Sequence, residues 1–179
     1  HGEALLSLGW TVRHAPSTFL RDAASRLLGE AYPAAEEFQS PAAWAFTLVG
    51  LHEYLAMYGG DSDARRLRNV LAERLQKRFE DNSDPNWPWF DGQVTATAAK
   101  MPHALLLAGQ WIPDSAMFES GIKSLGWLLD QQTAPGGHLS LIGDSEWLVR
   151  NGERSRFDQR PCAAMHLAEA CAEAFRATA

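Results

Sequence analysis

The character of successive predicted helices alternates along the chain, and this alternation restricts the fold more than any other feature. The segment 42–58 is apolar almost all round, which predicts a helix that is buried on every side. The segment after Asp61 has a single apolar stripe on an otherwise charged surface, made of Leu67, Leu71, Leu75 and Phe79. Such a stripe is typical of a helix that covers a core from outside. We therefore expect hairpins that each join one inner and one outer helix.

Start signals give the positions of these helices. Ser40 and Pro41 combine a preferred N-cap residue with proline in the first turn, where the missing N–H costs nothing. Similar signals begin three outer helices, at Ser17 or Thr18, at Asp61, and at Asp114 or Ser115. Seven helices are expected, and the four inner ones are predicted near 2–11, 41–58, 95–110 and 160–177. A short strand pair is expected around 138–142 and 146–149.

Stacked hairpins of this type form a solenoid or close into an α/α toroid. The two long loops, 81–94 and 133–160, both precede inner helices. We therefore expect these loops to gather at one rim of an all-α domain that spans residues 1–179.

Charge and length exclude several classes of protein. The net charge of −6 disfavours nucleic acid as a partner, because phosphate binding requires a basic face. No apolar run reaches the roughly 18 residues that a membrane span requires. A length of 179 residues suits one domain.

The cysteines and histidines give no sign of a disulfide or a metal site. Cys162 and Cys171 are nine residues apart on one predicted helix and point to opposite sides, so they cannot bridge each other. A reducing cytoplasm is the simplest interpretation. The histidines have no spacing typical of a zinc site, and no cofactor is expected. His52 and His103 lie on apolar helices and are predicted to be core residues with satisfied hydrogen bonds.

The stretch 150–161 is dense in arginine and carboxylate. It contains Arg154 and Arg156 close to Glu153 and Asp158, and it ends at a proline that opens the last helix. These groups can form a clamp that fixes the loop, or they can offer polar contacts to a ligand with many hydroxyls. In either case we expect both arginines to contact these carboxylates or backbone carbonyls, since an unpaired buried guanidinium is costly.

The loop 81–94 contains three aromatic residues within four positions, namely Trp87, Trp89 and Phe90. A proline-rich loop with this pattern is not an amphipathic helix. The three rings either fill the end of the helical core or form a surface on which a ligand stacks.

Three motifs together resemble an α/α-toroid domain of bacteria, which is often fused to or encoded beside family 4 glycosyltransferases. They are the runs 87–90, 101–105 and 152–159, which read Trp-Pro-Trp-Phe, Met-Pro-His-Ala-Leu and Gly-Glu-Arg-Ser-Arg-Phe-Asp-Gln. This domain is similar in architecture to six-hairpin glycosidases, and the resemblance covers nearly the whole chain. The family pattern extends beyond both ends of this sequence. The resemblance therefore implies about half of an (α/α)6 toroid.

The chain departs from the family pattern before its fifth helix. The family has Tyr-Asp-Asn where this chain has Ala96, Thr97 and Ala98. If that acid and amide serve a sugar or a catalytic step, this chain has lost them.

The resemblance implies a carbohydrate-related domain that binds or processes a glycan at the rim, as an accessory to a glycosyltransferase. Hydrolysis requires two carboxylates that flank one bond, and Asp91 and Asp158 are the catalytic candidates. Flat rings and polar groups suited to a sugar are Trp87, Trp89, Phe90, Trp147, Arg154, Arg156 and Gln159. The alternative is a non-catalytic helical scaffold that binds another protein.

A half toroid would leave the sides of its first and last helices open. The apolar residues predicted on those flanks are Leu5, Leu6, Leu8, Trp10, Met165, Leu167 and Phe175. A large exposed apolar patch is uncommon on a monomer, so a homodimer or higher assembly is expected.

Overall fold

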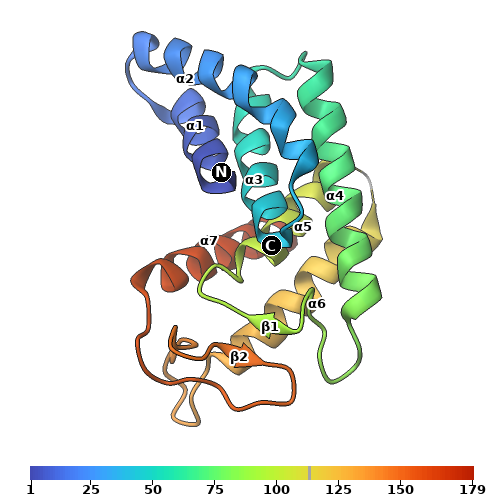
Figure 1. Ribbon diagram of the computed structural model, residues 1–179, viewed down its shortest axis with the longest axis vertical. Helices are drawn as coiled ribbons and strands as arrows, with labels where there is room; N and C mark the ends of the chain where they lie inside the picture. The colour runs from blue at the N-terminus through green and yellow to red at the C-terminus, as the bar shows by residue number, and fades with distance from the viewer. Residues whose placement is uncertain (113) are drawn as a thin grey trace.

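Helices dominate the computed structural model, which describes residues 1–112 and 114–179 (Figure 1). Within these residues the chain forms seven α-helices, one 3-10 helix and two short strands, which confirms the predicted all-α class. The elements are α1 (Gly2–His14), α2 (Thr18–Ala31), η1 (Tyr32–Glu37), α3 (Pro41–Met57), α4 (Ser62–Asn82), β1 (Gln93–Val94), α5 (Lys100–Trp111), α6 (Ser115–Gln131), β2 (Leu148–Val149) and α7 (Pro161–Thr178).

The helices begin where their capping residues predict. The carboxylate of Asp61 accepts a hydrogen bond from the backbone N–H of Ala64 at 2.9 Å, and Asp114 accepts one from Ala116 at 2.9 Å. These contacts satisfy backbone donors that the first turn of a helix leaves without a partner. Pro41 and Pro161 each occupy the first turn of their helix. Lys100 begins α5 five residues later than expected, because residues 96–99 form turns.

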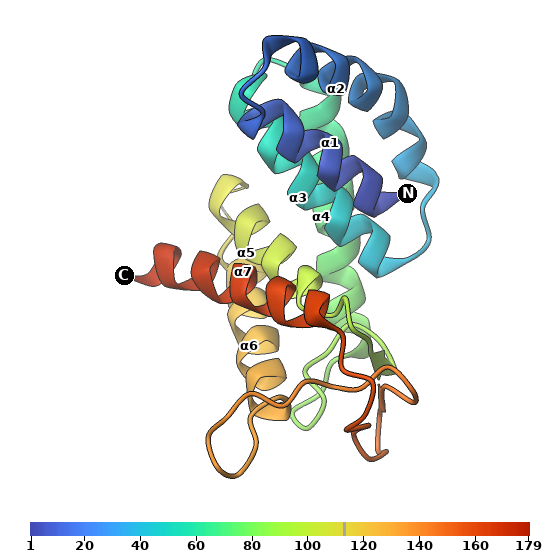
Figure 2. The ribbon, with the colours of Figure 1, turned by 90° about the vertical axis from the view of Figure 1, so that its left-hand side faces the viewer.

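The odd-numbered helices pack against one another in chain order. α1 packs on α3, α3 on α5 and α5 on α7, while α2 packs on α1, α4 on α3 and α6 on α5. Figure 2 shows α1 and α3 at one end of the molecule and α5 and α7 toward the other. This order brings residues from the start and the end of the chain around the same pair of central helices.

The closest helix contact joins α1 to α3 through Gly9 and Gly50. A Cβ atom on Gly9 would lie 2.0 Å from the carbonyl oxygen of Gly50, and one on Gly50 would lie 2.6 Å from that of Leu5. No side chain fits at such distances, so both positions require glycine. A similar contact joins α5 to α6, where a Cβ on Gly109 would lie 2.7 Å from the backbone nitrogen of Phe118.

The long loops meet at one end of the molecule, but their strands do not pair as predicted. Leu148 and Val149 form a strand as expected, yet their antiparallel partners are Val94 and Gln93 rather than residues 138–142. The backbone N–H of Arg150 extends this contact by donating to the carbonyl of Gly92 at 2.9 Å. Residue 139 makes only an isolated bridge, to Thr133. Pairing across the two loops ties them together, which pairing within the second loop would not do.

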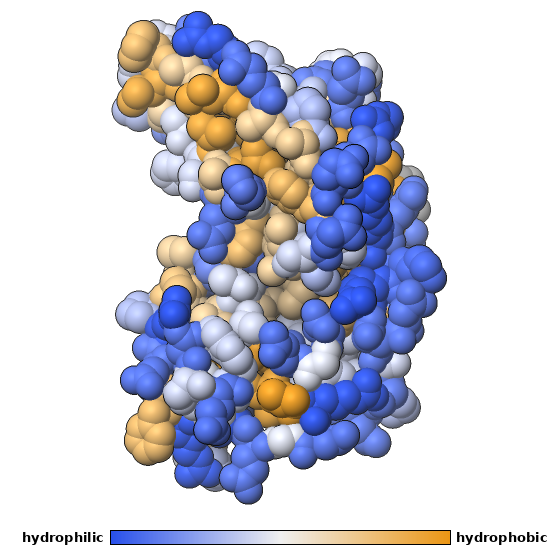
Figure 3. Space-filling view, viewed as in Figure 1, coloured by the Kyte–Doolittle hydropathy of each residue, from blue (hydrophilic) through white to orange (hydrophobic). Residues whose placement is uncertain are grey.

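The predicted flanks are partly covered within the chain itself. Leu5 and Leu167 are buried, whereas Trp10, Met165 and Phe175 are exposed. Further apolar side chains are exposed on α2, namely Phe19, Leu20 and Leu27, and Figure 3 shows apolar surface over this helix. Self-association through these surfaces stays a prediction.

In the described part of the chain, no helix has the length and apolarity to cross a membrane, and both cysteines are free thiols.

Replacing Gly50 with alanine should destabilise the fold, because the new methyl group would meet the backbone of α1. We expect the free energy of unfolding to fall by about 3 kcal/mol, as in other overpacked cores, in urea denaturation followed by circular dichroism. Gly126→Ala is the matched control, since a Cβ at this position on α6 meets nothing within 4 Å. That variant should be unchanged or more stable by up to about 1 kcal/mol. Equal stability of the two variants would contradict the close contact of α1 and α3.

Candidate ligand-binding cleft

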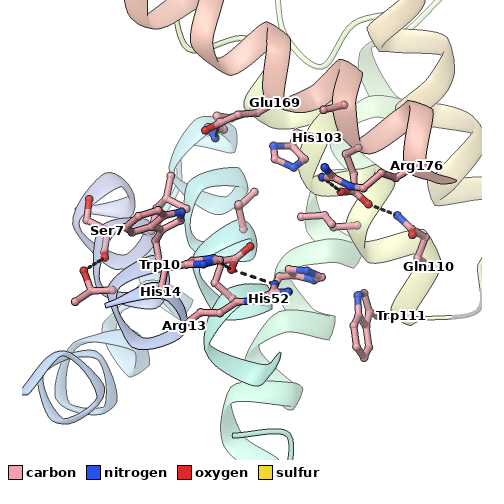
Figure 4. A pocket seen from close by; sticks show the side chains of 18 residues that line it. Ser7, Trp10, Arg13, His14, His52, His103, Gln110, Trp111, Glu169 and Arg176 are labelled. Atoms are coloured by element: carbon pink, nitrogen blue, oxygen red, sulfur yellow. Dashed lines mark hydrogen bonds and ion pairs between the residues drawn. The ribbon is translucent and has the colours of Figure 1, made fainter. Parts of the chain in front are cut away.

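A cleft of about 890 Å³ lies between α1, α3, α5 and α7. Ligand-binding pockets typically enclose about 300–1,000 Å³, so this volume suits a small-molecule ligand. Its lining combines apolar side chains such as Leu6, Val49 and Leu107 with charged, aromatic and imidazole groups (Figure 4).

One wall of the cleft is a polar row shared by α5 and α7. Lys100 is almost completely buried, and its ammonium group pairs with the carboxylate of Glu169, which is 44% exposed. Farther along the same two helices, Glu173 accepts a hydrogen bond from Gln110 at 2.9 Å and forms an ion pair with Arg176 at 2.5 Å. These contacts fix the spacing of the two helices along the wall.

The opposite wall has a second charged group, on α1 and α3. The carboxylate of Glu53 pairs with the guanidinium of Arg13 at 3.1 Å and with the ring of His14 at 2.9 Å. Glu53 is only 17% exposed, so its carboxylate contacts these two partners more than it contacts water. Both walls of the cleft are therefore built from paired charges.

Two tryptophans expose their rings beside the cleft. Trp10 on α1 is 56% exposed and Trp111 on α5 is 55% exposed. Each ring contacts a histidine, Trp10 with His14 at 4.7 Å between ring centroids and Trp111 with His52 at 5.5 Å. In the view of Figure 4, Trp10 and Trp111 lie on either side of His52. The cleft thus offers flat apolar faces next to polar groups.

Burial favours the neutral form of three histidines in this region, His52, His103 and His166. Burial lowers the pKa of His103 to about 4, and the nearby charge of Lys100 contributes to the decrease. Burial also lowers the pKa of His52 and of His166. The Nδ1 atoms of His103 and His166 are buried without a hydrogen-bond partner among the described residues. His103 is thus buried as expected, but the expectation that its hydrogen bonds are satisfied is wrong.

Glu173 is held as a carboxylate. Burial alone raises the pKa of Glu173, but the hydrogen bonds from Gln110 and Arg176 outweigh it, so the pKa lies below its usual value. The positions of these donors explain why a buried acid keeps its charge in the cleft wall.

The low pKa of His103 predicts a loss of stability in acid. The unfolded chain binds a proton at this residue near pH 6.5 and the folded chain only near pH 4, so stability decreases as pH falls between these values. His103→Gln should make this decrease shallower, by up to about 3 kcal/mol at pH 4. Urea denaturation at several pH values measures the slope, and His52 and His166 contribute to the remainder.

His138→Gln is the matched control, since this histidine is exposed on a loop. Its slope should match that of the unsubstituted protein. A His103→Gln variant with the same slope would show that the imidazole is not protected from protonation.

The aromatic residues predicted to stack on a ligand are instead part of the core. Trp89 and Phe90 are completely buried and Trp87 is 6% exposed. The indole N–H groups of Trp87 and Trp89 donate to the carbonyls of Asp91 and Gln93, at 2.7 and 3.2 Å. Both rings also pack against Trp127, with centroids 4.8 and 5.4 Å away. Because their faces are covered, a sugar cannot stack on them, and the binding role predicted for all three residues is wrong.

The two catalytic candidates do not line the cleft. Asp91 lies in the loop before β1, where its carboxylate pairs with Arg78 at 3.2 Å and accepts the N–H of Gly92 at 2.9 Å. Asp158 is exposed in the second long loop and has a positive φ of 60°. Asp91 therefore fixes a turn.

The remaining predicted binding residues support the second long loop. Arg154 donates to the carbonyls of Gln131 and Ser140, as expected, whereas Arg156 is exposed and its guanidinium has no partner among the described residues. The side chain of Gln159 joins Leu141 to Arg156 through two hydrogen bonds of 3.1 Å. The loop is further fixed by ion pairs of Arg150 with Asp84 and of Arg160 with Asp144, which are not the carboxylates predicted.

Trp147 is half-buried at a positive φ of 58°, and it packs against a small cluster of Ala96, Leu141 and Ala163. It does not line the cleft. None of the residues predicted to bind a ligand or to act in catalysis lines the cleft.

The residues that line the cleft were not predicted as binding residues, although the sequence contains a signal for this face. Lys100, His103 and Gln110 share one face of α5, and His166, Glu169, Glu173 and Arg176 share one face of α7. A polar stripe on a helix that is otherwise small and apolar indicates a face turned toward a cavity or a ligand.

In comparisons with known proteins, no family model, no curated protein and no solved structure matches this chain. Across residues 1–112 and 114–179 there is also no group of three or more histidine, cysteine or acidic residues arranged to hold a metal ion.

Proposed function

We propose that this chain is a glycan-binding domain of the α/α-toroid class, accessory to a glycosyltransferase, and that it holds the sugar in the cleft between α1, α3, α5 and α7. The observation that carries the proposal is the pair of exposed tryptophans, Trp10 and Trp111, beside a cleft of about 890 Å³. The sequence motifs that resemble the toroid family support the same class of ligand.

Exposed indole rings suit a sugar because its C–H faces are apolar while its edges carry hydroxyls. Trp10 and Trp111 supply the flat faces from two different helices. Gln110, Ser7 and His52 also line the cleft and supply groups that can donate to or accept from hydroxyls. This combination of a few polar groups with apolar surface is typical of specific small-molecule sites.

The carboxylates of the cleft favour binding over hydrolysis. A glycosidase requires one protonated carboxyl as a general acid and a second carboxylate across the scissile bond. Glu53, Glu169 and Glu173 each form an ion pair with a cationic side chain. The pKa of Glu173 also lies below its usual value, which disfavours it as a general acid. The three acids are thus committed to the structure of the walls. We therefore propose a binding role without catalysis.

Substituting either cleft tryptophan should weaken glycan binding while leaving the fold intact. A glycan array identifies a bound oligosaccharide, and titration calorimetry then compares the protein with its Trp10→Ala and Trp111→Ala variants. Each variant should bind at least about tenfold more weakly, a loss of about 1.4 kcal/mol, because a stacking face is removed. Both rings are more than half exposed, so the melting temperatures should change little.

Phe157→Ala is the control for this experiment. Phe157 is 78% exposed, but it lies in the second long loop, outside the cleft. Binding should be unchanged in this variant. A loss of binding in Phe157→Ala with no loss in the tryptophan variants would contradict the proposal. It would indicate that the glycan binds at the long loops instead.

A second candidate function is a scaffold that binds another protein without a sugar. It is favoured by the exposed apolar side chains of α2, Phe19, Leu20 and Leu27, which lie on a helix that contributes nothing to the cleft. The same surface could serve the self-association expected from the sequence. The tryptophan variants separate the two functions, since a scaffold that uses α2 would not depend on Trp10 or Trp111.

A further inference from the structure

We infer that the cleft selects uncharged oligosaccharides and discriminates against acidic ones, such as those that contain uronic acids. This inference rests on the proposed glycan-binding function and narrows its class of ligand. The supporting observation is that the charged side chains of the cleft walls are already neutralised by one another in the absence of a ligand.

Every cationic side chain that lines the cleft has its own carboxylate there. The three pairs are Arg13 with Glu53, Lys100 with Glu169 and Arg176 with Glu173. An acidic sugar is recognised most strongly by a guanidinium or ammonium group that is free to form a charge-assisted hydrogen bond. Because each of these groups already has a partner, an acidic sugar would have to displace a carboxylate to reach one.

Lys100 is the group on which this discrimination depends. Its side chain is only 2% exposed, and Glu169, the partner that covers it, is 44% exposed. An incoming carboxylate would bring a second anion beside one cation, and the two anions would repel each other. Displacing Glu169 would also take from its carboxylate the ammonium group that neutralises it.

Two histidines on the α3 and α5 walls of the cleft do not add a positive charge, and a third, His14, shares the carboxylate of Glu53 with Arg13. His52 and His103 both line the cleft, and burial keeps the pKa of each below its usual value. A neutral imidazole has one N–H donor and one nitrogen acceptor, which matches the donor and acceptor of a hydroxyl group. In addition, the net charge of −6 on the chain repels an acidic ligand at long range.

Pairs of oligosaccharides that differ only in charge test the inference. Glucuronic acid and glucose oligomers of equal length and linkage, or galacturonic acid and galactose oligomers, are titrated into the protein at low ionic strength. We expect the neutral member of a pair to bind at least tenfold more tightly. Glu169→Gln, which leaves Lys100 without its carboxylate, should reduce this ratio at least threefold and make binding of the acidic member more sensitive to salt.

Two further variants serve as a control for net charge and as a second test of the cleft. Glu36→Gln changes the net charge equally, but Glu36 pairs with Arg66 outside the cleft, so the ratio should stay unchanged. Glu53→Gln provides a second cleft variant if Glu169→Gln does not fold. It frees Arg13, whose side chain is 40% exposed and can remain hydrated without its partner.

The possible outcomes separate this inference from the proposed function. An acidic oligosaccharide that binds the unsubstituted protein as tightly as its neutral counterpart overturns the charge selection and leaves the glycan-binding function in place. An unchanged ratio in the cleft variants also overturns it. The absence of binding by any oligosaccharide overturns the proposed function itself.

Discussion

The contact of Gly9 with Gly50 is the constraint on which the cleft depends. It brings the backbones of α1 and α3 closer than any side chain allows. Trp10 follows Gly9 directly, and His52 and Glu53 follow Gly50 within three residues, so the contact also sets the distance between groups on one wall. Gly109 plays the same part on α5, where it lies against Phe118 and directly precedes Gln110 and Trp111. Both cleft tryptophans are thus held next to glycines that the packing requires.

The helical pattern could be predicted from the sequence because its causes are local. The buried helix 41–57 has few polar residues, and Asp61 and Asp114 cap the helices that they precede. The rim was less predictable, since the pairing of Gln93 with Val149 depends on contacts between two loops far apart in sequence. The burial of Trp89 could not be predicted for the same reason. Its ring is covered by Trp127, which lies on another helix.

The cleft itself could not be predicted, because its pairs join distant parts of the chain. Lys100 and Glu169 are 69 residues apart, and Arg13 and Glu53 are 40 apart. Spacing along one helix shows that Lys100 and His103 share a face, but it does not show which helix lies opposite. The predicted binding residues lie in the long loops, whereas the exposed rings and paired charges of the cleft lie along the helices. A wall of paired charges and neutral histidines is suited to recognising hydroxyl groups without ionic contacts.

The central claim, that a ligand is held in the cleft beside Trp10 and Trp111, is tested most directly by nuclear magnetic resonance of the indole N–H groups. The chain has seven tryptophans, whose indole signals can be assigned one by one through substitution. On titration with a neutral oligosaccharide, the signals of Trp10 and Trp111 should shift with a common dissociation constant, while those of Trp89 and Trp147 should not. Shifts confined to Trp147, or to the other tryptophans outside the cleft, would contradict the account.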